Sequence, residues 1–156
     1  MSDPVARTVG EAFEKFGREP GPLLEILHEV QNRLGCVPAA AVPLIADALN
    51  LSRAEVHGVV SFYHHFREHA PGRFVVQLCR AEACQSMNAR ALEAHARKLL
   101  GVGFGETTAD GRVTLEAVYC LGNCACSPAL MVNGELHGRV TPERFTELAA
   151  GWRTRS

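Results

Sequence analysis

The sequence predicts an α/β (α+β) protein in which a small N-terminal helical module, residues 1–70, precedes a β-α-β-β-β-α domain, residues 71–156. Before residue 70, apolar residues recur at steps of three and four, the spacing that lines one face of a helix. After it, short apolar runs bounded by turn residues are typical of strands. The stretch His69-Ala-Pro-Gly72 separates the two patterns, and 156 residues are enough for one core with a helical extension.

The first twenty residues are expected to form an arm. They are largely polar, contain Gly10 and Gly17, and end at the helix breaker Pro20-Gly-Pro22. At most one short helix, around Ala12–Phe16, is expected within them.

Three short helices are expected after the arm. From residue 23 onward, apolar side chains line one face of a helix that Gly35 can end. Pro43 suits the first turn of a second helix, and Ser52 with Glu55 makes a capping box for a third. Their spacing and short loops predict a helical module packed on itself.

The second domain is expected to begin with a strand, a helix and a strand. Residues 73–78 form an apolar run typical of a strand buried on both faces. Ser86 can cap the helix that follows, and Gly101 can end it. Asp110-Gly111 then turns the chain into a second strand, residues 113–118.

A hairpin and a last helix are expected to complete this domain. Residues 129–132 and 135–140 flank Asn133-Gly134, a pair that favours a type I′ turn. Thr141 can cap the last helix, with Pro142 at its first position.

Five of the six cysteines lie in two groups, Cys79-x4-Cys84 and Cys120-x3-Cys124-x-Cys126. Each group follows one of the two strands that the predicted helix connects. Such a unit closes as a right-handed crossover with parallel strands, whose carboxyl ends lie at one edge of the sheet. We therefore expect both cysteine groups at that edge, where open sheets place their sites.

Four thiolates suit tetrahedral zinc, an iron-sulfur cluster or two disulfides. Structural zinc usually has a C-x2-C pair, and the wider intervals here favour a [2Fe-2S] cluster. Cys79 and Cys84 would bind one iron, and Cys120 and Cys124 the other. A structural zinc module and a thiol oxidoreductase stay as alternatives, although the latter favours a C-x-x-C at a helix start. Cys126 is a second candidate for the fourth ligand, and only one of Cys124 and Cys126 can face the cluster.

Three other patterns have simpler interpretations. The pair His64-His65 lies in an aromatic string that favours packing or a protein contact, because neighbouring helical residues point about 100° apart. Cys36 has no partner nearby in the sequence and is left unassigned. The glycines of residues 101–105 follow a helix, whereas phosphate-binding glycines open one, so they indicate a loop.

Composition excludes several classes of function. A net charge of −1 and a pI near 6.6 supply no basic face for nucleic acid. The longest apolar stretch, residues 39–51, is interrupted and too short to cross a bilayer, so no membrane insertion is expected. No secretory signal is visible at the start, which predicts a cytoplasmic location. No catalytic grouping can be placed in one pocket, so the chain is expected to transfer electrons without transforming a substrate.

Several strings resemble the thioredoxin-like [2Fe-2S] ferredoxin subunit family. They are Leu23–Gln31, Gly35–Pro38, Val56–Tyr63 and the two cysteine groups. The resemblance covers nearly all of the chain past residue 20. That family includes the 24-kDa-type subunit of complex I, the small diaphorase subunit of bidirectional NAD-linked hydrogenases, and the gamma subunit of NAD-dependent molybdenum formate dehydrogenases.

Within that family, Cys79–Met87 most resembles the formate dehydrogenase gamma subunits, with Ala83 where complex I relatives more often have proline. The resemblance implies a thioredoxin-like domain whose cluster ligands are Cys79, Cys84, Cys120 and Cys124, whereas Cys126 departs from the pattern. It further implies a non-catalytic electron-transfer subunit of an NAD-dependent formate dehydrogenase complex. An equivalent subunit of complex I or of a hydrogenase is the alternative.

The same resemblance implies two partners. One is an FMN/NAD-binding flavoprotein subunit with a [4Fe-4S] cluster, on which this chain docks partly through its helical module. The other is a molybdenum-containing formate dehydrogenase large subunit, whose molybdenum cofactor oxidises formate to CO2 while NAD is reduced.

Overall fold

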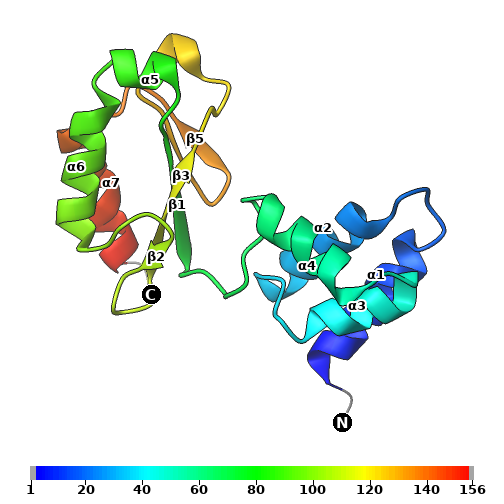
Figure 1. The fold of residues 1–156 in the computed structure, drawn as a ribbon. Helices are drawn as coiled ribbons and strands as arrows, with labels where there is room; N and C mark the ends of the chain where they lie inside the picture. The colour runs from blue at the N-terminus through cyan, green and yellow to red at the C-terminus, as the bar shows by residue number, and fades with distance from the viewer. Residues whose placement is uncertain (1–2, 155–156) are drawn as a thin grey trace. The chain divides into compact units, whose positions relative to one another are not determined.

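The computed structural model describes residues 3–154, and the chain divides into two compact units, Met1–Ala70 and Pro71–Ser156 (Figure 1). Each unit buries its own apolar cluster. Within the described residues there are seven α-helices and one five-stranded mixed sheet, which confirms the predicted α/β class and suits a thioredoxin-like fold. No helix within residues 3–154 is long and apolar enough to cross a bilayer.

The first unit is a set of four helices. They are α1 (Pro4–Phe16), α2 (Leu23–Leu34), α3 (Ala41–Leu49) and α4 (Arg53–Phe62). Its buried centre is made by Val9 and Ala12 of α1 together with apolar residues of the three later helices: Ile26, Leu27, Val30, Ala41, Ile45, Ala46, Val56 and Val60. Each of the four helices has an apolar face that it cannot bury alone. Packing the four faces together removes this apolar surface from water.

The predicted N-terminal arm is wrong, because residues 4–16 form a full helix. The Asp3 side chain accepts from the Val5 N–H at 3.0 Å, and Pro4 fills the first helical position. Val9 and Ala12 are buried at 4% and 0% exposure. The stretch looked polar because only a narrow stripe of α1 faces the core.

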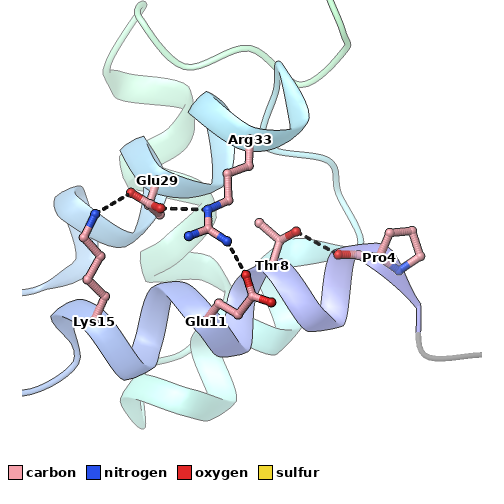
Figure 2. A network of polar contacts seen from close by, with 6 residues as sticks. All are labelled: Pro4, Thr8, Glu11, Lys15, Glu29 and Arg33. Atoms are coloured by element: carbon pink, nitrogen blue, oxygen red, sulfur yellow. Dashed lines mark hydrogen bonds and ion pairs between the residues drawn. The ribbon is translucent and has the colours of Figure 1, made fainter.

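Ion pairs join the polar face of α1 to α2 (Figure 2). Lys15 donates to Glu29 at 3.1 Å, and Arg33 bridges Glu29 of its own helix and Glu11 of α1. These donors, Lys15 first and then Arg33, hold the pKa of the Glu29 carboxyl below its ordinary value. The charges therefore link two helices that also share an apolar contact.

The predicted helix ends in this unit are confirmed. Gly35 ends α2 with a left-handed φ of 78°, a conformation that glycine adopts without strain. Pro43 lies in the first turn of α3, and Ser52 with Glu55 forms both hydrogen bonds of a capping box at α4.

The segment after α4 is held by one buried amide. Gln31 donates from Nε2 to the His65 carbonyl at 2.8 Å and accepts the Arg67 N–H at 2.7 Å. The rings of His28 and Phe66 pack with centroids 5.0 Å apart, and His65 packs on His28 at 5.4 Å. The expected packing role of the aromatic string therefore holds for His65 and Phe66.

The second unit wraps a mixed sheet. Its strands are β1 (Phe74–Cys79), β2 (Glu106–Thr107), β3 (Val113–Val118), β4 (Leu130–Val132) and β5 (Glu135–His137), in the order β2-β3-β1-β4-β5. Its helices are α5 (Glu82–Ser86), α6 (Ala89–Leu100) and α7 (Pro142–Thr154), with a short 3-10 helix, η1 (Cys124–Cys126). Figure 1 shows α6 and α7 side by side against the sheet, where Leu92, Phe145 and Trp152 enter its core.

Two local predictions for this unit are confirmed. Asn133 and Gly134 both have positive φ, 48° and 87°, as a type I′ turn requires. The Thr141 hydroxyl accepts the Arg144 N–H at 3.2 Å at the start of α7.

Two other local predictions are wrong, and one strand was not predicted. Ser86 does not cap α6, because residues 82–86 wind into their own helix and α6 begins after Asn88. β2, which was not predicted, pairs antiparallel with β3. The last strand ends at His137 and not at Val140, because Arg139 takes a left-handed φ of 52°.

Two substitutions on α1 test whether it is a packed helix. Gly10→Ala should raise the free energy of unfolding by about 1 kcal/mol, since a Cβ there meets no atom within 4 Å and alanine favours the helix. Ala12→Leu should lower it by about 1 to 3 kcal/mol, because the site is fully buried. Urea unfolding measures both, and equal, negligible effects at the two positions would indicate an unpacked arm.

Candidate metal centre

The pairing of β1 with β3 brings the two cysteine groups together. These strands are parallel neighbours, with Cys79 opposite Val118 at their carboxyl ends. The Arg80 N–H donates to the Val118 carbonyl at 2.7 Å and extends the pairing beyond Cys79. Tyr119 and Cys120 follow directly, so the loop after β1 and the loop after β3 begin side by side.

Cys79 and Cys84 form a buried pair, at 3% and 2% exposure. Cys79 is the last residue of β1, and the short helix α5 carries Cys84 back toward it, against Ala89 and Ala129. Burial is the main cause that raises the pKa of the Cys79 thiol, and its hydrogen bond with Cys84 raises it further. The Cys79 thiol therefore resists becoming a thiolate unless a cation compensates the charge.

Backbone donors partly offset this burial. The N–H groups of Ala81 and Leu121 lower the pKa of the Cys79 thiol by hydrogen bonding. Leu121 belongs to the loop after β3, so the loop that carries Cys120 and Cys124 also contacts the sulfur of Cys79. Donors aimed at a ligating sulfur are a known means of tuning a metal centre.

Cys120 and Cys124 form a second pair, which is exposed, with 4.0 Å between their sulfurs. The Gly122 N–H donates to the Cys120 sulfur at 3.3 Å. Hydrogen bonding with Cys120 is the main cause that raises the pKa of the Cys124 thiol. The Cys124 thiol therefore also resists ionisation in the absence of a cation.

The loop that carries this second pair has an unusual backbone. Cys120 has φ 145° and Gly122 has φ 73°, and a positive φ is uncommon for a residue with a side chain. Such conformations persist where surrounding contacts impose them, and they cluster at functional sites. The chain therefore stores strain at one of the four predicted ligands.

Ser127 links the two pairs. Its hydroxyl donates to the Cys124 carbonyl at 2.7 Å and lies 3.6 Å from the Cys84 sulfur, from which it accepts. The charge of Cys84 also raises the pKa of the Cys124 thiol, although it is a minor cause. The four thiols are thus one interacting group.

Gly138 holds the same loop from outside. A Cβ added there would lie 2.7 Å from Asn123 Nδ2, 2.8 Å from Cys126 Cβ and 2.9 Å from the Cys126 carbonyl oxygen. The Arg139 N–H donates to that oxygen at 2.6 Å. Cys126 therefore lies against the segment that follows β5.

The arrangement fits a cluster held by two pairs of thiolates. Within residues 3–154, no three Cys, His, Asp or Glu side chains gather around one point that could hold a single ion. Instead the thiols stand as a buried pair and an exposed pair at one edge of the sheet. The four cysteines that the sequence predicts as ligands lie together here, whereas Ser127 and Gly138 were not predicted. A serine three residues after Cys124 is a signal for a local side-chain turn, whereas nothing in the sequence marks Gly138.

Comparisons with known proteins agree with this chemistry. The family model described as thioredoxin-like [2Fe-2S] ferredoxin matches residues 9–153. One subunit of the NADH-quinone oxidoreductase of Pseudomonas aeruginosa is 38% identical over 125 residues, which are 80% of this chain and 75% of the relative. The HndA subunit of the NADP-reducing hydrogenase of Solidesulfovibrio fructosivorans is 30% identical over 150 residues, 96% of this chain and 88% of the relative.

A solved structure has the same fold. A chain of an NAD+-reducing [NiFe]-hydrogenase in the H2-reduced state superposes with a TM-score of 0.73 at 25% identity over 86% of this chain. This chain spans only 22% of that hydrogenase chain, so the likeness concerns one part of a larger protein.

A substitution at Gly138 tests how tightly the second cysteine loop is held. Gly138→Ala should lower the free energy of unfolding by about 1 to 3 kcal/mol, since its Cβ would meet backbone and Cβ atoms that cannot move singly. Gly151→Ala in α7 is the matched control, because a Cβ there has no atom within 4 Å. Thermal or urea unfolding measures both. A stability unchanged at Gly138 would mean that the loop yields freely.

Proposed function

Because the chain belongs to the thioredoxin-like [2Fe-2S] ferredoxin family, we propose that it is the electron-transfer subunit of an NAD-linked oxidoreductase complex of the NADH-quinone oxidoreductase or hydrogenase type. Membership of the family implies one [2Fe-2S] cluster. The observation that carries the proposal is the meeting of two thiol pairs at the carboxyl ends of adjacent parallel strands. The cluster supplies a one-electron carrier when it is bound.

The proposed ligands are Cys79 and Cys84 for one iron and Cys120 and Cys124 for the other. The raised pKa of one thiol in each pair, Cys79 by burial and Cys124 by its hydrogen bond with Cys120, supports this assignment, because bound iron would compensate the thiolate charge. The buried pair anchors the centre against the core. The exposed pair faces solvent, where an electron-transfer partner can approach.

The partner proposed for this surface is a flavoprotein subunit that binds FMN and NAD. The names of the relatives support it, since both describe enzymes that use a nicotinamide nucleotide. The formate dehydrogenase membership and its molybdenum partner remain predictions that rest on Cys79–Met87, and the relatives favour the quinone and hydrogen alternatives. The cytoplasmic location also remains a prediction.

Metal analysis of the purified full chain tests the proposal. We expect a red-brown protein with visible absorption bands and equal amounts of iron and acid-labile sulfide. A colourless protein that contains one zinc and no sulfide would instead establish the structural zinc module. Reduction of a disulfide substrate, lost on Cys84→Ser, would establish the thiol oxidoreductase.

Serine substitutions test the ligand set. Cys79→Ser, Cys84→Ser, Cys120→Ser and Cys124→Ser should each remove most of the visible absorbance, because a hydroxyl is a much poorer ligand for iron than a thiolate. Cys126→Ser is the matched control on the same loop and should keep the absorbance and the iron content. Loss of colour in Cys126→Ser, with retention in Cys124→Ser, would move the fourth ligand to Cys126.

Copurification from the native source identifies the complex. A flavoprotein subunit is expected in every case, and the remaining subunit separates the alternatives. Nickel would indicate a hydrogenase, a membrane arm a quinone reductase, and molybdenum a formate dehydrogenase. Purification of the chain with no flavoprotein under mild conditions would contradict the proposed partner.

A further inference from the structure

The hydroxyl of Ser127 is a buried polar group that contacts the thiol of Cys84 in one pair and the backbone carbonyl of Cys124 in the other. Ser127 is 6% exposed and follows the cysteine loop on the way into β4. Its oxygen lies 3.6 Å from the Cys84 sulfur of the buried pair and 2.7 Å from the carbonyl oxygen of Cys124 in the exposed pair. A buried hydroxyl is normally hydrogen-bonded, and the direction of one of its hydrogen bonds limits the directions of the others.

The directions of these hydrogen bonds follow from counting hydrogens. A serine hydroxyl has one hydrogen to donate and can accept others. In the structure that hydrogen points to the Cys124 carbonyl, so the thiol of Cys84 is the donor toward Ser127. Both hydrogen bonds, from Cys84 to Ser127 and from Ser127 to the Cys124 carbonyl, can form only while the Cys84 sulfur carries a hydrogen.

Binding of iron by Cys84 removes that proton, so the sulfur can no longer donate a hydrogen bond to Ser127. In the proposed function, on which this inference rests, Cys84 is a cluster ligand. Its sulfur then only accepts, and the nearest buried hydroxyl is that of Ser127. The Cys124 carbonyl does not need the hydroxyl hydrogen, because it also accepts the backbone N–H of Ser127, at 3.4 Å.

We propose that Ser127 turns its hydrogen from the Cys124 carbonyl to the sulfur of iron-bound Cys84, and thereby raises the reduction potential of the centre. Ser127 is thus a positioning residue that acts through Cys84. The turn leaves no buried group unpaired, since the backbone N–H keeps the carbonyl satisfied. Uptake of one electron breaks no covalent bond, and the hydrogen stays on the serine oxygen throughout.

The sign of the effect follows from charge. Reduction adds negative charge to a centre whose thiolate ligands are already anionic, and a hydrogen bond to an anionic acceptor strengthens as its charge grows. The donor therefore stabilises the reduced state more than the oxidised one. Burial of Ser127 keeps water from replacing the hydroxyl if the side chain is shortened.

A redox titration of the full chain with its cluster tests the proposal. The reductant is dithionite, and the signal of the reduced state is followed by EPR. Ser127→Ala should weaken the affinity for the electron about threefold to tenfold, and a tenfold change is a shift of about 59 mV to lower potential. Ser127→Thr, which keeps a hydroxyl, should restore the potential toward that of the unchanged protein.

Ser86→Ala is the matched control. The Ser86 hydroxyl also bonds a backbone carbonyl next to a cysteine, that of Ala83 at 2.8 Å, but it is exposed and donates to no sulfur. Its removal should leave the potential unchanged. An unchanged potential in Ser127→Ala, with the cluster intact, would overturn the inference. Ser127 would then only stabilise the loop, through its hydrogen bond to the Cys124 carbonyl.

If Ser127→Ala retains too little cluster for a redox titration, a second measurement tests the inference. Exchange of the unchanged protein into D2O should reveal an exchangeable hydrogen coupled to the reduced centre, and Ser127→Thr should preserve it. Absence of that coupling in the unchanged protein overturns the inference. A protein that never binds iron and sulfide at all would instead overturn the proposed function, so the two failures are distinguishable.

Discussion

The parallel pairing of β1 with β3 is the constraint on which the rest of the candidate site depends. It places Cys79 level with Val118, so that each cysteine loop leaves the sheet where the other does. The crossover through α5 and α6 makes this pairing possible, because parallel neighbours cannot be joined by a tight turn. The burial of Cys79 and Cys84 and the contact of Leu121 with the Cys79 sulfur follow from it.

The two thiol pairs share a place but not an environment. Both pairs receive backbone donors, but the first is buried beside Ala89 and Ala129, whereas the second lies at the surface on a loop with a strained Cys120. Such a loop keeps its shape only if its neighbours hold it. Gly138 approaches it too closely for any other side chain, and Arg139 and Ser127 hydrogen-bond its carbonyls. The exposed cysteines are therefore held in place by the segments that flank β4 and β5.

In the helical unit, as in the cysteine loop, one buried polar side chain holds a non-helical segment in place. Gln31 is 5% exposed, and its amide satisfies a carbonyl and an N–H of the segment after α4 that have no helical partners. The ion pairs of Glu29 with Lys15 and of Arg33 with Glu11 lie at the surface and contribute less, since solvent screens them. Burial of Val9 and Ala12 is what holds α1 in place.

The sequence by itself determined the class of fold, most helix ends and the four cysteines of the candidate site. These depend on local rules: periodicity, capping by Ser52, the φ of Gly35 and of Asn133-Gly134, and the order of strand, helix and strand. Only the tertiary structure decided that residues 4–16 pack as a helix, that residues 82–86 form a helix of their own before α6, and that Ser127 and Gly138 meet the cysteine loops. The contact of Ser127 with Cys84 and that of Gly138 with Asn123 join residues distant in the chain, and no local pattern encodes these two contacts.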